Sequence, residues 1–406
     1  MKSNNFKKKL ITFRQLGVFE QICRICDSLH FKYATRIQAQ VIPYALKNRD
    51  VLGYSHTGSG KTLAFVIPIL QDLLIHKSVF FCLTIAPARE LAFQIATQFE
   101  ILGGIFGLRI ALLVGGIENI SQVSIINRNP HVLICTPGRL VDHLEKTKTL
   151  VLKNLKNLVL DEADRLLQND FDRELLIILA SLPKSKRCFL FSATMTDKVE
   201  KLERISMTNP IKIQISKKYK IAISLKQNYI FVPYRFKDCY LTYICNEFIN
   251  CAMIVFVDTQ ICAEKTALLL KILNFKASCL HGKFDQKKRM DILYKFKLGQ
   301  YKILIATDLV SRGIDIPGVD LIVNYDIPLY TKDYIHRVGR TARAGKSGRV
   351  INLITQYDVR SCQKIELLLG KKFEEYHCNM KNMASINKFV SFAKIKANNI
   401  LQKIKN

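Results

Sequence analysis

The chain has 406 residues, 49% of them hydrophobic, a length that exceeds one typical folding core and suits two domains. It carries 62 lysines and arginines against 33 acidic residues, and a net charge of +29 favours nucleic acid over a membrane as partner. Richness in Lys, Ile and Asn offers another source of this charge, because an AT-rich coding sequence biases composition in the same direction.

The lysine-rich start, Met1 to Lys9, has no apolar core, so no secretory signal peptide is expected, and Lys7–Lys9 suggest nuclear import. No stretch reaches the roughly 18–20 apolar residues of a membrane span. Of the 12 cysteines, Cys23 and Cys26 form one C-x-x-C pair without a second pair at metal-binding spacing. We therefore expect buried free thiols and a reducing compartment.

Short apolar runs alternate with helix-like segments along the whole chain. In the first half, strands are predicted at Val51–Gly53, Phe80–Ile85, Arg109–Val114, Val132–Cys135, Leu158–Leu160 and Cys188–Phe191. In the second half, they are predicted at Lys226–Phe231, Ala252–Val257, Lys276–Cys279, Ile303–Ala306, Leu321–Tyr325 and Arg349–Leu353. Helical periodicity appears at Thr62–Ile75, Arg89–Leu102 and Ala263–Leu273. This alternation predicts two similar α/β domains, each a parallel sheet covered by helices on both faces.

The expected domains are 1–215 and 223–377, joined by a basic linker at 216–222 and followed by a basic tail at 378–406. In the tail, apolar residues recur at helical spacing. They are Phe389, Ala393, Ala397, Ile400 and Ile404. We therefore predict an amphipathic helix that has these residues on its apolar face.

A glycine-rich segment at 57–62 follows the strand at Val51–Gly53 and opens a helix. Its residues are Thr57, Gly58, Ser59, Gly60, Lys61 and Thr62. Backbone N–H groups of such a turn can bind phosphates, while Lys61 can reach the terminal phosphates and the Thr62 hydroxyl can bind Mg²⁺. The general pattern begins with Gly where this chain has Ser55, and a glycine turn alone is often only a turn.

An acidic tetrapeptide, Asp161-Glu162-Ala163-Asp164, ends the apolar run Leu158–Leu160. An acidic pair after a strand is often just a solvated strand end. Both motifs together, in this order, indicate a nucleoside triphosphatase in which Asp161 holds Mg²⁺ and Glu162 activates the attacking water.

The tetrapeptide and its companion motifs resemble those of the DEAD-box ATP-dependent RNA helicases, over roughly residues 11–365. The resemblance implies two tandem RecA-like domains, with ATP and Mg²⁺ as cofactors. It also implies that Phe13, Thr35 and Gln38 form an adenine-binding motif, in which Gln38 hydrogen-bonds the base and Phe13 stacks on it. Within that motif Ala34 replaces the usual proline.

Further motifs of the family imply RNA contacts and coupling residues. The residues implied to contact the RNA backbone are Pro87, Arg89, Gly115, Gly116, Thr136, Pro137, Gly138, Arg139, Gly282, Arg289 and Thr307. The residues implied to couple ATP to RNA are Asp164, Ser192, Thr194 and His336. Ala88 stands where the family has a threonine, so one hydroxyl contact is lost.

In the second half, Asp315 is implied to bind the ATP ribose, and Arg340 and Arg343 to act as arginine fingers on the transferring phosphoryl group. Arg337 belongs to the same run, and the alternative for all three arginines is a solvated basic face. Because the arginines and the phosphate-binding turn lie in different domains, only closure of the domains would assemble the site.

Within the family, the stretch Leu225–Pro233 with Phe236–Asp238 is similar to the nucleolar subgroup that processes small-subunit ribosomal RNA, as is Val390–Ala397. We thus expect a monomer that acts in the nucleus or nucleolus, without a membrane, on RNA and with protein activators or pre-ribosomal particles. The alternatives are a slow-turnover RNA clamp, a role in translation initiation or splicing, and a DNA helicase. Intact catalytic positions argue against an inactive clamp.

Overall fold

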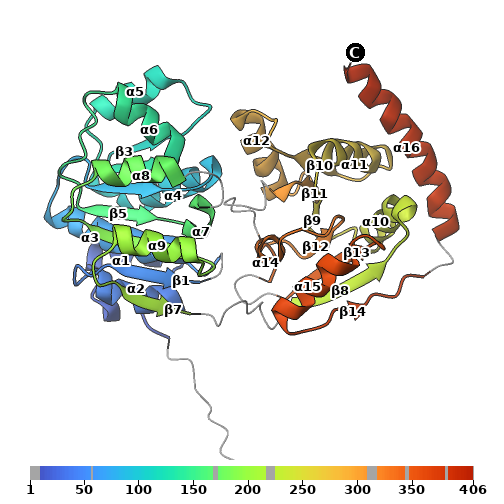
Figure 1. The fold of residues 1–406 in the computed structure, drawn as a ribbon, viewed down its shortest axis with the longest axis horizontal. Helices are drawn as coiled ribbons and strands as arrows, with labels where there is room; N and C mark the ends of the chain where they lie inside the picture. The colour runs from blue at the N-terminus through green and yellow to red at the C-terminus, as the bar shows by residue number, and fades with distance from the viewer. Residues whose placement is uncertain are drawn as a thin grey trace, which may run out of the picture. The chain divides into compact units, whose positions relative to one another are not determined.

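The computed structural model describes residues 10–55, 58–167, 172–215, 225–308, 318–342, 347–379 and 383–405. The chain divides into two compact units, Met1–Lys218 and Tyr219–Asn406, and each is built around a seven-stranded parallel sheet (Figure 1). The predicted fold class, two RecA-like α/β domains, is confirmed. None of the described helices is long and apolar enough to cross a membrane.

Unit 1 has its strands in the order β3-β4-β2-β5-β6-β1-β7. The strands are β1 (Val51–Tyr54), β2 (Cys82–Ile85), β3 (Ile110–Leu113), β4 (Val132–Cys135), β5 (Asn157–Leu160), β6 (Arg187–Ser192) and β7 (Ile211–Gln214). The helices are η1 (Arg14–Leu16), α1 (Glu20–Ser28), α2 (Arg36–Ala45), α3 (Lys61–Ile75), α4 (Arg89–Gly103), η2 (Gly104–Phe106), α5 (Asn119–Asn127), α6 (Pro137–Lys146), α7 (Ala163–Leu166), α8 (Asp172–Ser181) and α9 (Asp197–Ser206).

Both faces of the unit 1 sheet are buried, because successive strand residues point to opposite sides. Val51 of β1 packs into one apolar core with α1 to α4, whereas its neighbour Leu52 packs into a second core with α5, α6, α8 and α9. This explains why the strands appear in the sequence as continuous apolar runs.

All 12 cysteines of the chain are free thiols.

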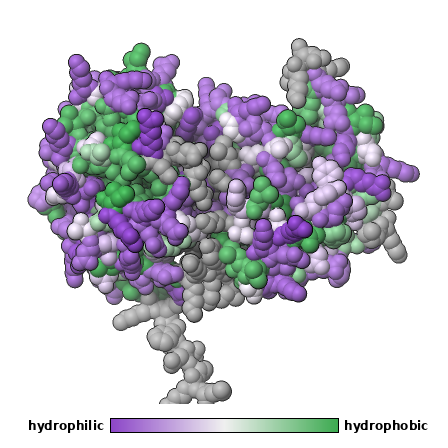
Figure 2. Space-filling model, viewed as in Figure 1, coloured by the Kyte–Doolittle hydropathy of each residue, from purple (hydrophilic) through white to green (hydrophobic). Residues whose placement is uncertain are grey.

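Unit 2 repeats the plan with the order β10-β11-β9-β12-β13-β8-β14. The strands are β8 (Leu225–Phe231), β9 (Met253–Phe256), β10 (Ala277–Leu280), β11 (Ile303–Ala306), β12 (Leu321–Asn324), β13 (Gly348–Ile354) and β14 (Glu374–Glu375). The helices are η3 (Tyr234–Phe236), α10 (Lys237–Glu247), α11 (Gln260–Ile272), α12 (Gln286–Lys297), α14 (Thr331–Val338), α15 (Val359–Leu369) and α16 (Met383–Lys405). Figure 2 shows a surface on which hydrophilic side chains predominate.

Two sequence-based expectations need correction. The sequence gives no signal for the edge strands β7 and β14, because β7 alternates exposed and buried residues and β14 consists of two exposed glutamates, so neither has a continuous apolar run. In α16, Phe389 does not lie on the buried face: its side chain is 69% exposed, while the adjacent Val390 is 2% exposed. Ala393 and Ala397 are fully buried, as predicted.

Candidate nucleotide and RNA sites

Apart from the predicted adenine motif, which precedes β1, the predicted site residues of unit 1 follow the carboxyl ends of its strands, which meet at one edge of a parallel sheet. The glycine-rich turn follows β1, the acidic tetrapeptide follows β5, and β6 ends at Ser192 between them. The predicted RNA contacts follow β2, β3 and β4, which are the neighbouring strands. The strand order therefore divides this edge into a half with the predicted phosphate-binding residues and a half with the predicted RNA contacts.

The glycine-rich turn ends at Gly60, which caps the N-terminus of α3 with φ 91°, a left-handed conformation that favours glycine. Gly58 also has a positive φ, 78°. The Lys61 ammonium donates to the Ser55 carbonyl at 3.1 Å, and the Ser55 and Ser59 hydroxyls lie 2.9 Å apart. This arrangement places Lys61 and the free N–H groups of α3 together, as phosphate binding requires.

Gln38 connects the predicted adenine motif to this turn. Its Nε2 donates to the Gly60 carbonyl at 3.0 Å, and its Oε1 accepts from the Thr35 N–H at 2.8 Å. An amide side chain has two N–H donors and two oxygen lone pairs, so one of each is left for a base. Phe13 is only 3% exposed and packs in the core of unit 1, which leaves little ring surface for stacking.

The two acidic residues after β5 have different surroundings. Burial raises the pKa of Asp161 to about 6, although nearby Lys61 opposes this shift. Its Oδ1 accepts from the N–H of Glu162, at 2.9 Å. Glu162 has φ 49°, a strained conformation for a non-glycine residue, and its carboxylate pairs with Arg165 at 2.6 Å.

The predicted coupling residues of unit 1 form a buried hydrogen-bonded cluster at the ends of β5 and β6. The Thr194 hydroxyl donates to Asp164 Oδ2 at 2.8 Å, and the Ser192 hydroxyl donates to the Thr194 carbonyl at 2.7 Å. The Ser55 N–H donates to the Ser192 carbonyl at 3.2 Å. A contact thus runs from the acidic tetrapeptide through β6 to the start of the glycine-rich turn.

Among the predicted RNA contacts, Arg89 at the start of α4 places its guanidinium against the glycine pair Gly115-Gly116 after β3. A Cβ on Gly115 would lie 2.9 Å from the Arg89 guanidinium, and a Cβ on Gly116 would lie 2.4 Å from it.

Arg139 of α6 donates to the Ile117 carbonyl at 3.2 Å and to the Asn119 side chain. Thr136 precedes α6 and its N–H donates to the Leu113 carbonyl at 3.1 Å. Pro137 and Gly138 form the first turn of α6.

Sequence reasoning missed one residue of this region, Gln122 of α5. Its buried Nε2 donates to the carbonyls of Val114 and Ile117, at 3.1 and 3.0 Å, and so holds both ends of the glycine pair. Its Oε1 lies 3.3 Å from Nε2 of His143. A single glutamine in a helix gives no pattern in the sequence, because most such residues face solvent.

In unit 2 two of the predicted RNA contacts also follow neighbouring strands. Gly282 follows β10, next to His281, and Thr307 follows β11, with the Thr307 N–H donating to the Leu280 carbonyl at 3.4 Å. His281 is fully buried, its Nε2 lies 3.1 Å from Glu264, and burial lowers its pKa. Arg289 lies on α12.

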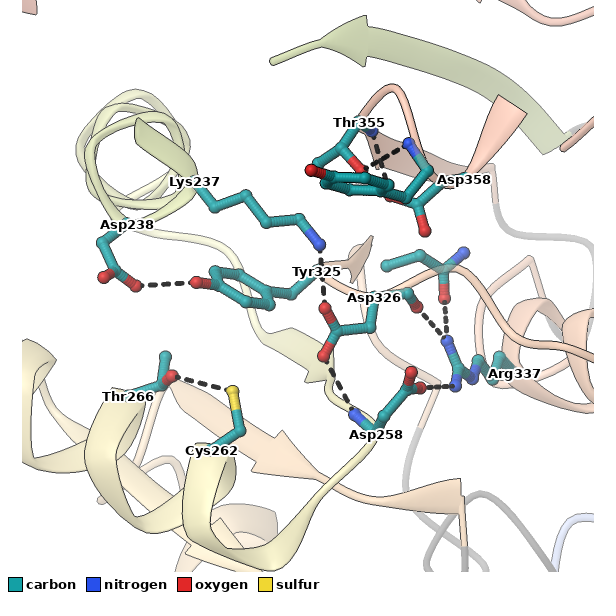
Figure 3. A network of polar contacts seen from close by, with 12 residues as sticks. Lys237, Asp238, Asp258, Cys262, Thr266, Tyr325, Asp326, Arg337, Thr355 and Asp358 are labelled. Atoms are coloured by element: carbon teal, nitrogen blue, oxygen red, sulfur yellow. Dashed lines mark hydrogen bonds and ion pairs between the residues drawn. The ribbon is translucent and has the colours of Figure 1, made fainter. Parts of the chain in front are cut away.

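The first arginine of the predicted arginine-finger run has a role inside unit 2. Arg337 of α14 has no exposed surface, and it donates to both carboxylate oxygens of Asp308, at 2.6 and 2.7 Å. It also donates to Asn324 Oδ1 and to the Asp326 carbonyl, and lies 3.5 Å from Asp258 (Figure 3). Arg337 therefore joins the ends of β9, β11 and β12, and neither a solvated face nor a finger describes it.

Two other predicted residues of this region are placed on or after α14. His336 lies within the helix and is buried, and Arg340 follows its C-terminus. Thr57, Asp315 and Arg343 lie outside the described residues, so the structure does not place them.

Three residues from the stretches that resemble the nucleolar subgroup, Lys237, Asp238 and Lys394, join a network at the start of α10. Lys237 donates to Asp326 Oδ1 at 2.8 Å, and Asp238 accepts from the Tyr325 hydroxyl at 2.9 Å (Figure 3). Lys394 of α16 lies 2.5 Å from the other oxygen of Asp238. These residues attach α10 to the end of β12 and to α16.

Comparison with known proteins gives matches over both units. The family model described as DEAD/DEAH box helicase matches residues 35–202, and the helicase conserved C-terminal domain matches residues 237–345. The Drosophila melanogaster protein named ATP-dependent RNA helicase DDX47 is 48% identical over 387 residues, 95% of this chain and 76% of that protein. The Schizosaccharomyces pombe protein named ATP-dependent rRNA helicase rrp3 is 47% identical over 386 residues, 95% of this chain and 83% of that protein.

Solved structures agree with these matches. The S. cerevisiae protein Dbp5, bound to RNA and ADP BeF3, has a TM-score of 0.83 at 28% identity, covering 94% of this chain and 99% of that one. Mss116p, bound to ssRNA and AMP-PNP, has a TM-score of 0.83 at 30% identity, covering 96% of this chain and 84% of that one.

Proposed function

Because the chain belongs to the DEAD/DEAH box helicase family, we propose that it is an ATP-dependent RNA helicase that acts on ribosomal RNA and its precursors. The observation that carries this proposal is the edge of unit 1, where the residues proposed to bind phosphates and those proposed to contact RNA follow adjacent strands. Relatives named rRNA helicases support the choice of RNA, and nucleolar localisation follows from that substrate.

Mg²⁺ fits the residues present. Asp161 and Thr62 offer hard oxygen ligands, and a cation beside Asp161 would favour its ionised form despite burial. The described residues contain no group of three or more His, Cys, Asp or Glu side chains able to hold a metal ion. Bound with ATP, such an ion would neutralise developing charge on the phosphates.

In the proposed mechanism, Lys61 exchanges its bond to the Ser55 carbonyl for the β- and γ-phosphates of ATP. Glu162 positions the attacking water and accepts its proton. Arg340 and Arg343 of unit 2 stabilise charge on the transferring phosphoryl group when the units close around ATP and RNA.

RNA is bound through its sugar–phosphate backbone, which makes binding tolerant of sequence. The absence of a side chain at Gly115 and Gly116 lets the Arg89 guanidinium lie against this turn, where its charge can meet a phosphate. A strand held in the closed state departs from duplex geometry, so closure separates short helices, and hydrolysis releases the strand.

The test is phosphate release with and without RNA. We expect Mg²⁺-dependent hydrolysis that RNA stimulates strongly, together with separation of a short labelled RNA duplex. An RNA clamp would bind RNA with ATP but turn over slowly, and a DNA helicase would respond equally to single-stranded DNA. Either outcome would reject the proposed activity, and crosslinking in cells followed by sequencing would test the ribosomal substrate.

Adenine selectivity is a separate prediction. Gln38 retains one donor and one acceptor, which match the adenine edge, whereas guanine presents the opposite pattern. We expect ATP to support RNA-stimulated hydrolysis and GTP to support little at the same concentration. Equal rates with the two nucleotides would remove Gln38 from base recognition.

A further inference from the structure

Helix α16 is fixed to unit 2 along one side. Val390, Ala393 and Ala397 are buried, and α16 packs against α10 and α11. The ion pair between Lys394 and Asp238 and a hydrogen bond from Cys239 Sγ to Asn387 Oδ1, at 3.2 Å, reinforce the contact. The helix therefore presents a defined opposite side to solvent (Figure 1).

The exposed surface of α16 carries large apolar side chains. Phe389 and Phe392 are each 69% exposed and Ile395 is 63% exposed. At about 100° per residue, Phe392 and Ile395 lie on the side of the helix away from the buried residues, whereas Phe389, one turn before Ala393, lies at the border of the buried stripe. Lys388 and Lys396 are exposed beside them. We call these five residues the outer face of α16. Figure 2 shows apolar side chains among hydrophilic ones on this part of unit 2.

The charged residues of α16 are all lysines, and no aspartate or glutamate follows Glu375 in the sequence. Lys394 is paired with Asp238, whereas Lys388 and Lys396 are exposed beside the two phenylalanines. These two lysines favour an anionic partner, and the two rings, about one helical turn apart, favour a partner with flat groups that can stack on them.

We propose that the outer face of α16 binds single-stranded RNA outside the helicase site, with bases stacked on Phe389 and Phe392 and phosphates at Lys388 and Lys396. Exposed aromatic rings beside cations are the usual platform for single-stranded nucleic acid. An anionic membrane fits less well, because interfacial helices bury a broad apolar face and that of α16 is already packed on unit 2. The choice of RNA over DNA rests on the proposed function.

The experiment measures binding of the full-length chain to a labelled oligouridine without ATP. Removing both rings in F389A/F392A should raise the dissociation constant about fivefold or more, since each stacked base contributes substantially. The variant F389L/F392L keeps the apolar character but loses the rings, and should be equally impaired. The control L367A removes an 86% exposed side chain on α15 and should bind like wild type.

The salt dependence of RNA affinity tests the contribution of Lys388 and Lys396. K388A/K396A should make the dependence of log affinity on log salt shallower by about 1.4, because each phosphate contact on a single strand contributes about 0.7. Thermal unfolding of every variant should match wild type, because the substituted side chains are largely exposed.

Unchanged RNA affinity of F389A/F392A would overturn the inference, as would normal binding by F389L/F392L. Binding of wild type to phosphatidylserine vesicles that depends on both phenylalanines, with RNA affinity unaffected, would assign the face to a membrane instead. Wild-type hydrolysis that RNA does not stimulate would reject the proposed function, whereas stimulated hydrolysis with an unaffected variant would reject only this inference.

Discussion

At the scale of single residues, neighbouring side chains on one strand end differ in their electrostatic surroundings. Asp161 is buried and its pKa is raised to about 6, whereas the adjacent Glu162 is paired with Arg165. Lys61 acts on the Asp161 carboxylate, whereas the Glu162 carboxylate accepts from Arg165 at 2.6 Å. This difference fits one carboxylate for the metal ion and one for the water.

Glu162→Gln should preserve ATP binding within a few-fold but reduce RNA-stimulated hydrolysis by about 100-fold or more, because an amide cannot accept the water's proton. The variant should also dissociate slowly from RNA when ATP is present. Rates come from single-turnover hydrolysis, and affinities from a fluorescent ATP analogue. Glu145→Gln, an exposed change on α6, is the matched control, and a Glu162→Gln rate near wild type would exclude the assigned role.

Some residue roles could be read from the sequence and others could not. Lys61 and Asp161 follow apolar runs in an order that constrains their place in an α/β fold, and the structure puts them at one edge of the sheet. Arg337 was grouped with its neighbouring arginines, because only the folded chain brings Asp308 and the end of β12 around it. The role of Gln122 was not predictable either, because only the folded chain brings the Val114 and Ile117 carbonyls to its side chain.

At the scale of elements, the turn between β1 and α3 depends on its last glycine. Ala at Gly60 would impose a left-handed conformation on a residue with a Cβ and place that Cβ 2.6 Å from Gln38 Nε2. Gly60→Ala should therefore weaken ATP binding by about tenfold or more. Gly107→Ala is the control, since its φ of 69° imposes similar strain in open space. If both variants bound ATP equally well, crowding at Gln38 would be unimportant.

A second element-scale prediction concerns α5 and the glycine pair. Gln122→Leu removes both hydrogen bonds to the Val114 and Ile117 carbonyls and should destabilise unit 1 by about 1–3 kcal/mol. The RNA concentration for half-maximal stimulation should rise several-fold, while ATP affinity stays constant. Ser124→Leu, an exposed change on the same helix, controls for added bulk. Unaltered RNA stimulation would show that Gln122 supports stability alone.

The order and type of the main elements were predictable because central strands of a parallel sheet are apolar on both faces. The prediction failed at edges and surfaces. Strand β7 pairs on one side only and alternates exposed and buried residues, and α16 has a second apolar stripe that periodicity assigned to its buried side. A pattern of apolar residues does not say which of two stripes meets the core.

At the scale of the whole molecule, the proposed catalytic groups come from both units. Unit 1 contains Lys61, Asp161, Glu162 and Gln38, and unit 2 contains the proposed arginine fingers. ATP binding and ATP hydrolysis should therefore respond differently to changes in unit 2. The central claim is that unit 2 contributes to the chemical step and not only to RNA affinity.

The measurement that tests this claim most directly is the maximal rate of hydrolysis by Arg343→Ala at saturating ATP and RNA, with Arg360→Ala, an exposed change on α15, as control. The rate should fall by about 10³–10⁵, as for arginine fingers in other phosphoryl-transfer enzymes, while ATP affinity of unit 1 changes little. A solvated basic face would instead weaken RNA binding, reversibly with salt, and preserve the maximal rate. A rate within a few-fold of wild type would contradict the account.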